Sequence, residues 1–245
     1  MNIEYPEVVT YRYDSWPGVT DQEAEVQFRL VYRGRLPAQS QSNIRTEDKH
    51  RIRKLFHKQL REFWNNHPFL SERKALLVSG LTPPATHPSI TGSVIVDETQ
   101  DDSSKRALLD LIADNYARCG YRFVPLVNNL DGVACSLDIL FLRRDEPGKL
   151  ITSGGDIDNR INVLFDALRM PKECHEIGGY ARSEDEDPFF CLLEDDSLIT
   201  EVKVTADRLL IPLAENESRN DVHLVIHVRT IVLRGLGGSI TAFLT

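Results

Sequence analysis

Apolar residues follow the two-residue period of a strand in some stretches of this chain and helical spacing in others. Residues 26–32 alternate as a strand does, and Gly34 and Pro37 then break the pattern. Residues 46–65 carry apolar side chains three and four positions apart, which predicts a helix with Thr46 as its N-cap. The stripe expected to be buried on this helix consists of Ile52, Leu55, Phe56, Leu60 and Phe63 or Trp64.

The rest of the chain continues this mixture of strands and helices. Further strands are predicted at residues 121–127, 134–142, 200–210 and 222–233. The turn at 128–132 is expected to pair the first two of these as a hairpin. Helical spacing runs from Ser103 or Ser104 to Ala117 and again over residues 160–168, whereas prolines and glycines predict mainly loop at residues 79–100.

Two or three helices interleaved with turn-linked strands predict an α+β fold, with a mixed, largely antiparallel sheet and two or three packed helices. The length of 245 residues allows one large domain or two small ones, and either could bury a substantial core. The interleaving of helices and strands favours one domain over residues 1–245. Residues 1–25 show no regular period and are interpreted as an irregular N-terminal extension.

Composition places the chain among globular proteins, with 41% hydrophobic and 27% charged residues. The four cysteines are scattered and form no Cys-x-x-Cys motif, so we expect free thiols in a reducing cytosol. Residues 1–20 lack the basic start and apolar run of a secretory signal, and no stretch has the length of a membrane span. A cytoplasmic protein without a membrane partner is therefore predicted.

The net charge of −8 is unfavourable for a nucleic-acid enzyme, although the distribution of charge matters more than its sum. The polar face of the 46–65 helix is nevertheless basic. One interpretation is a helix that faces DNA phosphates; the other is a solvated face that offsets acidic residues elsewhere. The first interpretation makes DNA-binding residues of Lys49, Arg53, Lys54 and Lys58.

Two acidic groups carry the candidate chemistry. Asp156, Asp158 and Asn159 open the 160–168 helix, and residues 194–197 read Glu-Asp-Asp-Ser before a strand. Carboxylate oxygens are the ligands that Mg²⁺ prefers, and such sites keep positions open for phosphate. Each group also has a structural interpretation, since aspartate commonly caps helices and forms turns. At about 100° per residue, one flank of the helix is expected to carry Asp158, Asn162, Asp166 and Arg169.

The order of these motifs over residues 134–204 resembles the RusA family of Holliday-junction resolvases. The family pattern is a strand, then Asp-x-Asp-Asn opening a helix with Asp-Ala-Leu, then an acid-Asp-Asp element before another strand; here Asp-Ala-Leu is residues 166–168. The resemblance implies that Asp156, Asp158 and Asp196 are catalytic and bind Mg²⁺ or Mn²⁺, with Asp195 as an adjacent metal-binding acid. It further implies a homodimeric hydrolase that cuts branched or junction DNA in recombination and repair.

Two features depart from the family. Its catalytic lysine stands four residues after the second aspartate, where this chain has Asn162, and asparagine cannot supply a positive charge to the transition state. Lys149, Lys172 and Lys203 are the candidates to replace it. Residues 170–193 form a longer segment than in compact members and are interpreted as an inserted, solvated acidic loop.

The leading hypothesis is therefore a divalent-metal-dependent, structure-specific endonuclease that hydrolyses phosphodiester bonds in Holliday-junction-type DNA. The alternative is a non-catalytic RusA-like module that binds nucleic acid or a protein, which Asn162 and the acidic balance favour. A third hypothesis is a protein-interaction module in which the acidic turns are only caps. Three aspartates within reach of one cation would favour either of the first two hypotheses, whereas aspartates that point apart would leave only the third.

Overall fold

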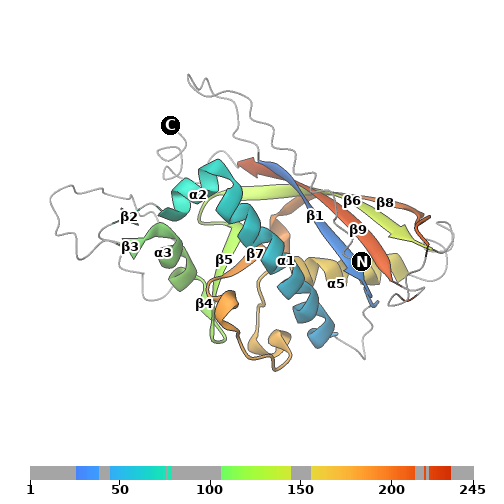
Figure 1. The fold of residues 1–245 in the computed structure, drawn as a ribbon, viewed down its shortest axis with the longest axis horizontal. Helices are drawn as coiled ribbons and strands as arrows, with labels where there is room; N and C mark the ends of the chain where they lie inside the picture. Colours follow the sequence, from blue (N-terminus) through green and yellow to red (C-terminus); the bar gives the residue numbers. More distant parts are fainter. Residues whose placement is uncertain are drawn as a thin grey trace, which may run out of the picture.

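A computed structural model describes residues 26–38, 45–75, 77–78, 106–144, 156–212, 218 and 221–232 (Figure 1). The predicted N-terminal extension and the predicted loop at 79–100 lie outside these residues. Among the described helices, none combines the length and apolar character that crossing a membrane requires.

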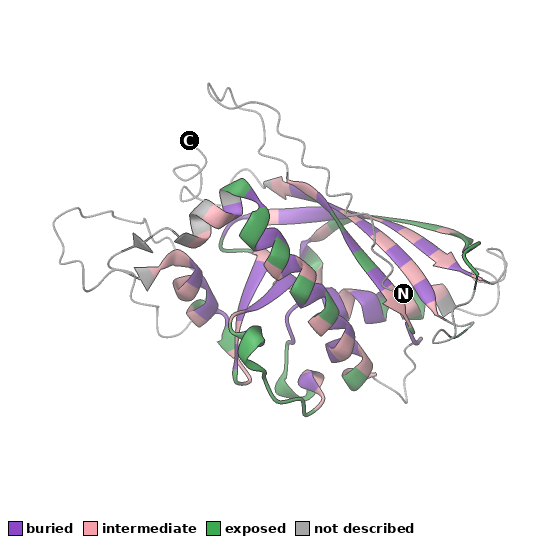
Figure 2. Ribbon diagram, in the orientation of Figure 1, coloured by how far each residue is buried: buried purple, intermediate pink, exposed green. Residues whose placement is uncertain are grey.

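A four-stranded sheet forms one side of the molecule, with strand order β1-β9-β6-β8. Its strands are β1 (Gln27–Gly34), β9 (Val222–Val232), β6 (Val133–Arg143) and β8 (Ile199–Arg208). β9 is antiparallel to both β1 and β6, whereas β8 runs parallel to β6. Buried residues alternate along β1 and β9, which leaves one face of the sheet on the core and the other toward solvent (Figure 2).

A second, three-stranded sheet has the order β4-β5-β7, from β4 (Ala117–Arg118), β5 (Tyr121–Val127) and β7 (Phe189–Leu193). The predicted hairpin between residues 121–127 and 134–142 is therefore wrong, because β5 pairs with β4 and β7, while β6 pairs with β9 and β8. Both strands exist, but the turn between them, held by the Asn128 side chain on Asp131, directs them into different sheets.

Helix α1 (Thr46–Asn66) crosses in front of β5 and β7 and packs on β7, α5 (Asp156–Leu168) and β1 (Figure 1). Its predicted extent is confirmed, but its N-cap is Arg45 in the left-handed region, without a side-chain capping bond. The predicted stripe is buried except for Leu55, which is 39% exposed. Two shorter helices, α2 (Pro68–Ala75) and α3 (Leu108–Asn115), lie beside the short strands β2 (Leu77–Val78) and β3 (Arg106–Ala107).

One hydrophobic cluster runs through both sheets and the helices between them, and the α+β class is confirmed. The predicted helix at 103–117 is shorter in the structure, because it begins at Leu108 and Ala117 already belongs to β4. The interpretation of residues 170–193 as a solvated loop holds for only part of the segment, because residues 172–175 and 179–185 are exposed whereas its two ends are buried. This segment contains the 3-10 helices η2 (Cys174–Ile177) and η3 (Glu184–Glu186) and the fully buried strand β7.

Candidate functional site

The acidic turn at residues 194–196 directly follows β7, and its first member serves the fold. Glu194 accepts a hydrogen bond from the backbone N–H of Asn129 at 2.7 Å and one from the Tyr116 hydroxyl at 3.2 Å. Burial, and then the charge of Glu194, raise the pKa of Tyr116. Glu194, which is half-buried, therefore anchors the turn after β5.

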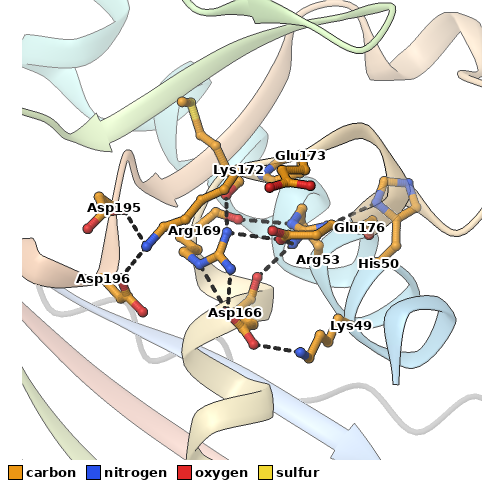
Figure 3. A network of polar contacts seen from close by, with 12 residues as sticks. Lys49, His50, Arg53, Asp166, Arg169, Lys172, Glu173, Glu176, Asp195 and Asp196 are labelled. Carbon is orange, nitrogen blue, oxygen red and sulfur yellow. Dashed lines mark hydrogen bonds and ion pairs between the residues drawn. The ribbon is translucent and has the colours of Figure 1, made fainter. Parts of the chain in front are cut away.

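Asp195, Asp196 and Lys172 form a group that we call the outer cluster (Figure 3). The Lys172 Nζ lies 2.8 Å from Asp195 Oδ2 and 3.1 Å from Asp196 Oδ1. Asp195 also caps the 3-10 helix η4 (Asp196–Leu198) by accepting the Ser197 backbone N–H at 3.0 Å. The three side chains of the cluster are 31–49% exposed, so solvent reaches all of them.

Proximity of opposite charges shifts the protonation of this group. The hydrogen bond to Asp195 raises the pKa of Lys172. Partial burial alone would raise the pKa of Asp195, but the bonds from Lys172 and Ser197 outweigh it and lower that pKa. Lys172 is therefore fully charged and Asp195 fully ionised at neutral pH.

Backbone contacts and a disulfide position Lys172. Arg169, just after α5, bridges to Leu193, and the Met170 N–H donates to the Leu193 carbonyl at 2.9 Å. Cys174, two residues beyond Lys172, forms a disulfide with Cys119. The expectation of four free thiols is thus wrong for this pair, while Cys135 and Cys191 are free and buried. The two bonded cysteines are 55 residues apart, and no spacing motif marks them.

The other predicted aspartates lie at the opposite end of α5. Asp156 and Asp158 occupy its first turn; Asp158 and Asn162 are exposed, as expected for the predicted flank, and the Asp156 side chain is outside the described residues. An α-helix rises about 1.5 Å per residue, so Asp158 is about 15 Å along the axis from Leu168, whose end of the helix adjoins the acidic turn.

The structure thus brings Asp195 and Asp196 together without Asp158, and the described side chains, which do not include Asp156, do not meet the expectation of three aspartates around one cation. Across the described part of the chain, no group of three or more histidine, cysteine, aspartate or glutamate side chains is arranged to hold a metal ion. Of the candidate lysines, Lys203 pairs with Asp138 at 2.9 Å, and Lys149 lies outside the described residues. Lys172 is the candidate that contacts predicted metal ligands.

A second group of charges, the inner cluster, fills the space between α1 and the C-terminal end of α5 (Figure 3). It consists of Lys49, Arg53, Asp166, Arg169 and Glu176. Arg53 donates to the carbonyls of Arg169 at 2.9 Å and Asp166 at 2.6 Å, which caps the last turn of α5. Lys49 pairs with Asp166 at 2.6 Å, and Arg169 pairs with Glu176 at 2.9 Å.

The inner cluster corrects both interpretations of the basic helix at two positions, Lys49 and Arg53. The side chains of Lys49 and Arg53 are 5% and 1% exposed, so they neither face DNA nor form a solvated surface. Lys54 pairs with the buried Glu186 at 2.8 Å and lies over the Tyr180 ring. Of the four predicted DNA-binding residues, Lys58 is the exposed one. The helical spacing placed Asp166 and Arg169 on one flank of α5. A charged flank on a packed helix was the signal from which charged partners on α1 could have been expected.

The chain matches no protein-family model, no curated protein and no solved structure. Functional inference therefore rests on the motifs of the sequence and on the geometry of the outer cluster. Two carboxylates beside a lysine, all open to solvent, can hold a cation and a phosphate together.

Proposed function

We propose that the protein is a divalent-metal-dependent endonuclease that acts on branched DNA, with Asp195, Asp196 and Lys172 at its reaction centre. The observation that carries the proposal is the position of Lys172, whose Nζ lies within 3.1 Å of both aspartates. Lys172, beside the paired carboxylates, supplies the positive charge that Asn162 cannot. It belongs to the segment after α5, whereas Asn162 lies within the helix.

The residues present fit a hard cation such as Mg²⁺ or Mn²⁺. Mg²⁺ keeps several of its waters and is commonly held by one or two carboxylates together with substrate phosphate oxygens. Asp195 and Asp196 would supply those carboxylates, and their 31% and 40% exposure leaves room for water and phosphate. When bound, the cation would activate a water and stabilise the departing oxygen.

Within this proposal Lys172 has a role that follows from its contacts. Its ammonium group now neutralises the carboxylates, and it can turn toward a phosphate that approaches them, because 49% of its side chain is exposed. There it would stabilise the negative charge that grows on the phosphate oxygens during hydrolysis. A homodimer completes the proposal, because paired nicks across a two-fold symmetric junction need two reaction centres.

The second candidate is a non-catalytic RusA-like module that binds nucleic acid or a protein. Two observations favour it: in the described part of the chain no three acidic side chains are arranged around one metal ion, and Lys49 and Arg53 are buried in the inner cluster. In this candidate Lys172 simply offsets the repulsion between Asp195 and Asp196.

A nicking assay on four-way junction DNA with Mg²⁺ or Mn²⁺ tests the proposal. We expect Asp196→Asn and Lys172→Met each to lower the cleavage rate by roughly 10²- to 10³-fold, the order of one electrostatic group at a reacting centre. Glu173→Gln is the matched control, because Glu173 adjoins Lys172 and is exposed but does not contact the aspartates. Its rate should equal that of the wild type.

Junction affinity should be measured in parallel, and it should change by less than about fivefold in these variants because single exposed charges contribute little to binding. Rates that are insensitive to both substitutions would refute this reaction centre. A folded wild-type protein that binds junction DNA but nicks none of it with either cation would establish the second candidate instead.

A further inference from the structure

The two edges of the main sheet are protected differently. At the β1 edge, Gln59 of α1 takes the place of a neighbouring strand: its Oε1 accepts the Val31 N–H at 2.9 Å, and its Nε2 donates to the Val31 carbonyl at 2.8 Å. Capping an edge in this way blocks the addition of another strand, which an open edge invites.

At the β8 edge the described chain offers no such cover. β8 has β6 as its one neighbour in the part of the chain that the structure describes, and residues 200–205 are all exposed (Figure 2). Val202 and Val204 are 43% and 36% exposed, although they stand in register with the buried Leu137 and Ile139 of β6. The apolar face of the sheet thus continues onto β8 beyond the helices that cover it.

The opposite face of β8 carries alternating charge. Lys203 pairs with Asp138 at 2.9 Å, and Glu201 lies 3.6 Å from Arg229. These pairs lie in rows across neighbouring strands, and Glu201 and Lys203 are the outermost members. The edge therefore presents a negative and a positive side chain two residues apart, on either side of an apolar residue.

We propose that a second copy of this chain pairs antiparallel along β8, about a two-fold axis at Val202. In this register Val202 faces the partner's Val202, and Glu201 faces the partner's Lys203, twice by symmetry. Each protomer thereby covers the exposed valine of the other, and the sheet becomes continuous through both. The proposed function requires a homodimer but assigns no surface to it; this pairing supplies one and stands even if the protein cuts no DNA.

Charge complementarity selects this register among its neighbours. Moving the axis by one residue sets Lys203 against the partner's Lys203, or Glu201 against the partner's Glu201, and like charges directly opposite are destabilising. An axis at Thr205 also pairs Lys203 with an acid, the partner's Asp207. That register, however, places Val202 opposite the partner's Arg208, which leaves the apolar face unmatched.

Sedimentation of the full chain over a range of concentrations tests the pairing. Val202→Lys places two like charges on the two-fold axis, and we expect it to raise the dimer Kd by roughly 100-fold. Val31→Lys is the matched control, because Val31 is 41% exposed and lies on the capped edge. It should leave the dimer Kd unchanged. A monomeric wild type, or equal effects of the two substitutions, would overturn the proposal.

Charge reversal tests the register independently of the valine. Glu201→Lys and Lys203→Glu should each weaken the dimer, and the double variant should recover most of the loss, since it restores opposite charges between protomers. In oxidising buffer, Val202→Cys should cross-link the dimer, whereas Thr205→Cys should not. Cross-linking through position 205 in place of position 202 would overturn the proposed axis. None of these outcomes depends on nuclease activity, so they separate a failed pairing from a failed proposed function.

Discussion

The C-terminal end of α5 has two clusters of paired acidic and basic side chains, and their surroundings differ. In the inner cluster Lys49, Arg53 and Arg169 are at most 7% exposed and meet carboxylates or carbonyls between two helices. In the outer cluster Lys172 is 49% exposed and meets Asp195 and Asp196 at the surface. Arg169 and Lys172 are three residues apart, yet one is fixed and the other is free to change partners.

Burial explains why the two clusters have different roles. A buried charge has lost its water, so every remaining hydrogen bond must come from the protein, and the network cannot exchange partners without a large loss. An exposed ion pair contributes little to stability and can exchange its partner for a ligand. Burial would raise the pKa of Asp166, but Lys49 and Arg169 outweigh it and lower that pKa, so the inner cluster is a matched set.

The largest effect is expected when the inner cluster loses one member. Arg53→Met removes the cap of α5, leaves the carbonyls of Asp166 and Arg169 without this donor, and removes the ion-pair partner of the half-buried Glu176. We expect the free energy of unfolding to fall by about 3–5 kcal/mol, the usual cost of breaking a buried charge network from one side. Urea denaturation followed by circular dichroism measures it.

Lys172→Met is the matched control for Arg53→Met, since it removes a cation from the outer cluster by a comparable truncation. Its cost should be within about 1 kcal/mol, as for other surface ion pairs. Equal losses in the two variants would remove the distinction between the clusters and with it the reason to assign them different roles.

A smaller effect is expected from the protonation of His50, which borders the inner cluster. Its Nδ1 lies 3.1 Å from the Arg53 guanidinium, and burial, followed by the charges of Arg53 and Lys54, lowers its pKa to about 4. The unfolded chain binds this proton near pH 6.5, so between pH 6.5 and 4 the unfolded state holds more protons. The free energy of unfolding should therefore decrease as the pH is lowered through this window, by up to about 3 kcal/mol from His50.

Unfolding curves at pH 7, 5.5 and 4.5 measure this slope. His57 and His67 also have lowered pKa values through burial and act in the same direction, so the comparison is between slopes of variants. His50→Gln should flatten the slope, whereas His175→Gln, at an exposed position, should not. An unchanged slope in His50→Gln would mean that the inner cluster accepts the extra positive charge.

Local periodicity was sufficient to predict most of the elements. The strands β1, β6, β8 and β9 and the helices α1 and α5 lie within a few residues of their predicted bounds, because alternation and helical spacing are properties of neighbouring residues. β7 was missed because Phe189–Leu193 is a continuous apolar run without alternation, as buried strands often are. The pairing of β5 with β7 joins segments about 65 residues apart, and no local pattern encodes it.

The same limit applies to the charged clusters. Lysine and arginine are seldom buried, so the basic face of α1 was interpreted as surface. The acidic residues that pair with Lys49 and Arg53 follow more than 100 residues later in the chain. The acidic turn was found from its sequence, and Lys172 was one of three lysines that could adjoin it. Choosing among them required two tertiary contacts that local sequence does not encode: the bridge between Arg169 and Leu193, and the disulfide between Cys119 and Cys174.

The smallest effect is expected at the far end of α5, and it tests whether the outer cluster is the reaction centre. Asn162 is exposed and stands one turn after Asp158, so Asn162→Lys places a cation beside Asp158, whereas Lys172 follows the C-terminal end of the helix. Stability should change by less than about 0.5 kcal/mol, as for other i,i+4 pairs on helix surfaces. The rate of junction cleavage should change by less than about threefold, because a charge screened by solvent over this distance contributes little.

Asn162→Gln is the control for a change of side chain without a change of charge, and unfolding free energies show whether either variant disturbs the helix. A rate that rises tenfold or more in Asn162→Lys alone would locate the chemistry at Asp158 and reduce the outer cluster to a structural ion pair. An unchanged rate, together with the loss expected in Lys172→Met, would leave Lys172 as the cation that acts on phosphate. A positive charge would then raise the cleavage rate beside Asp195 and Asp196 but not beside Asp158.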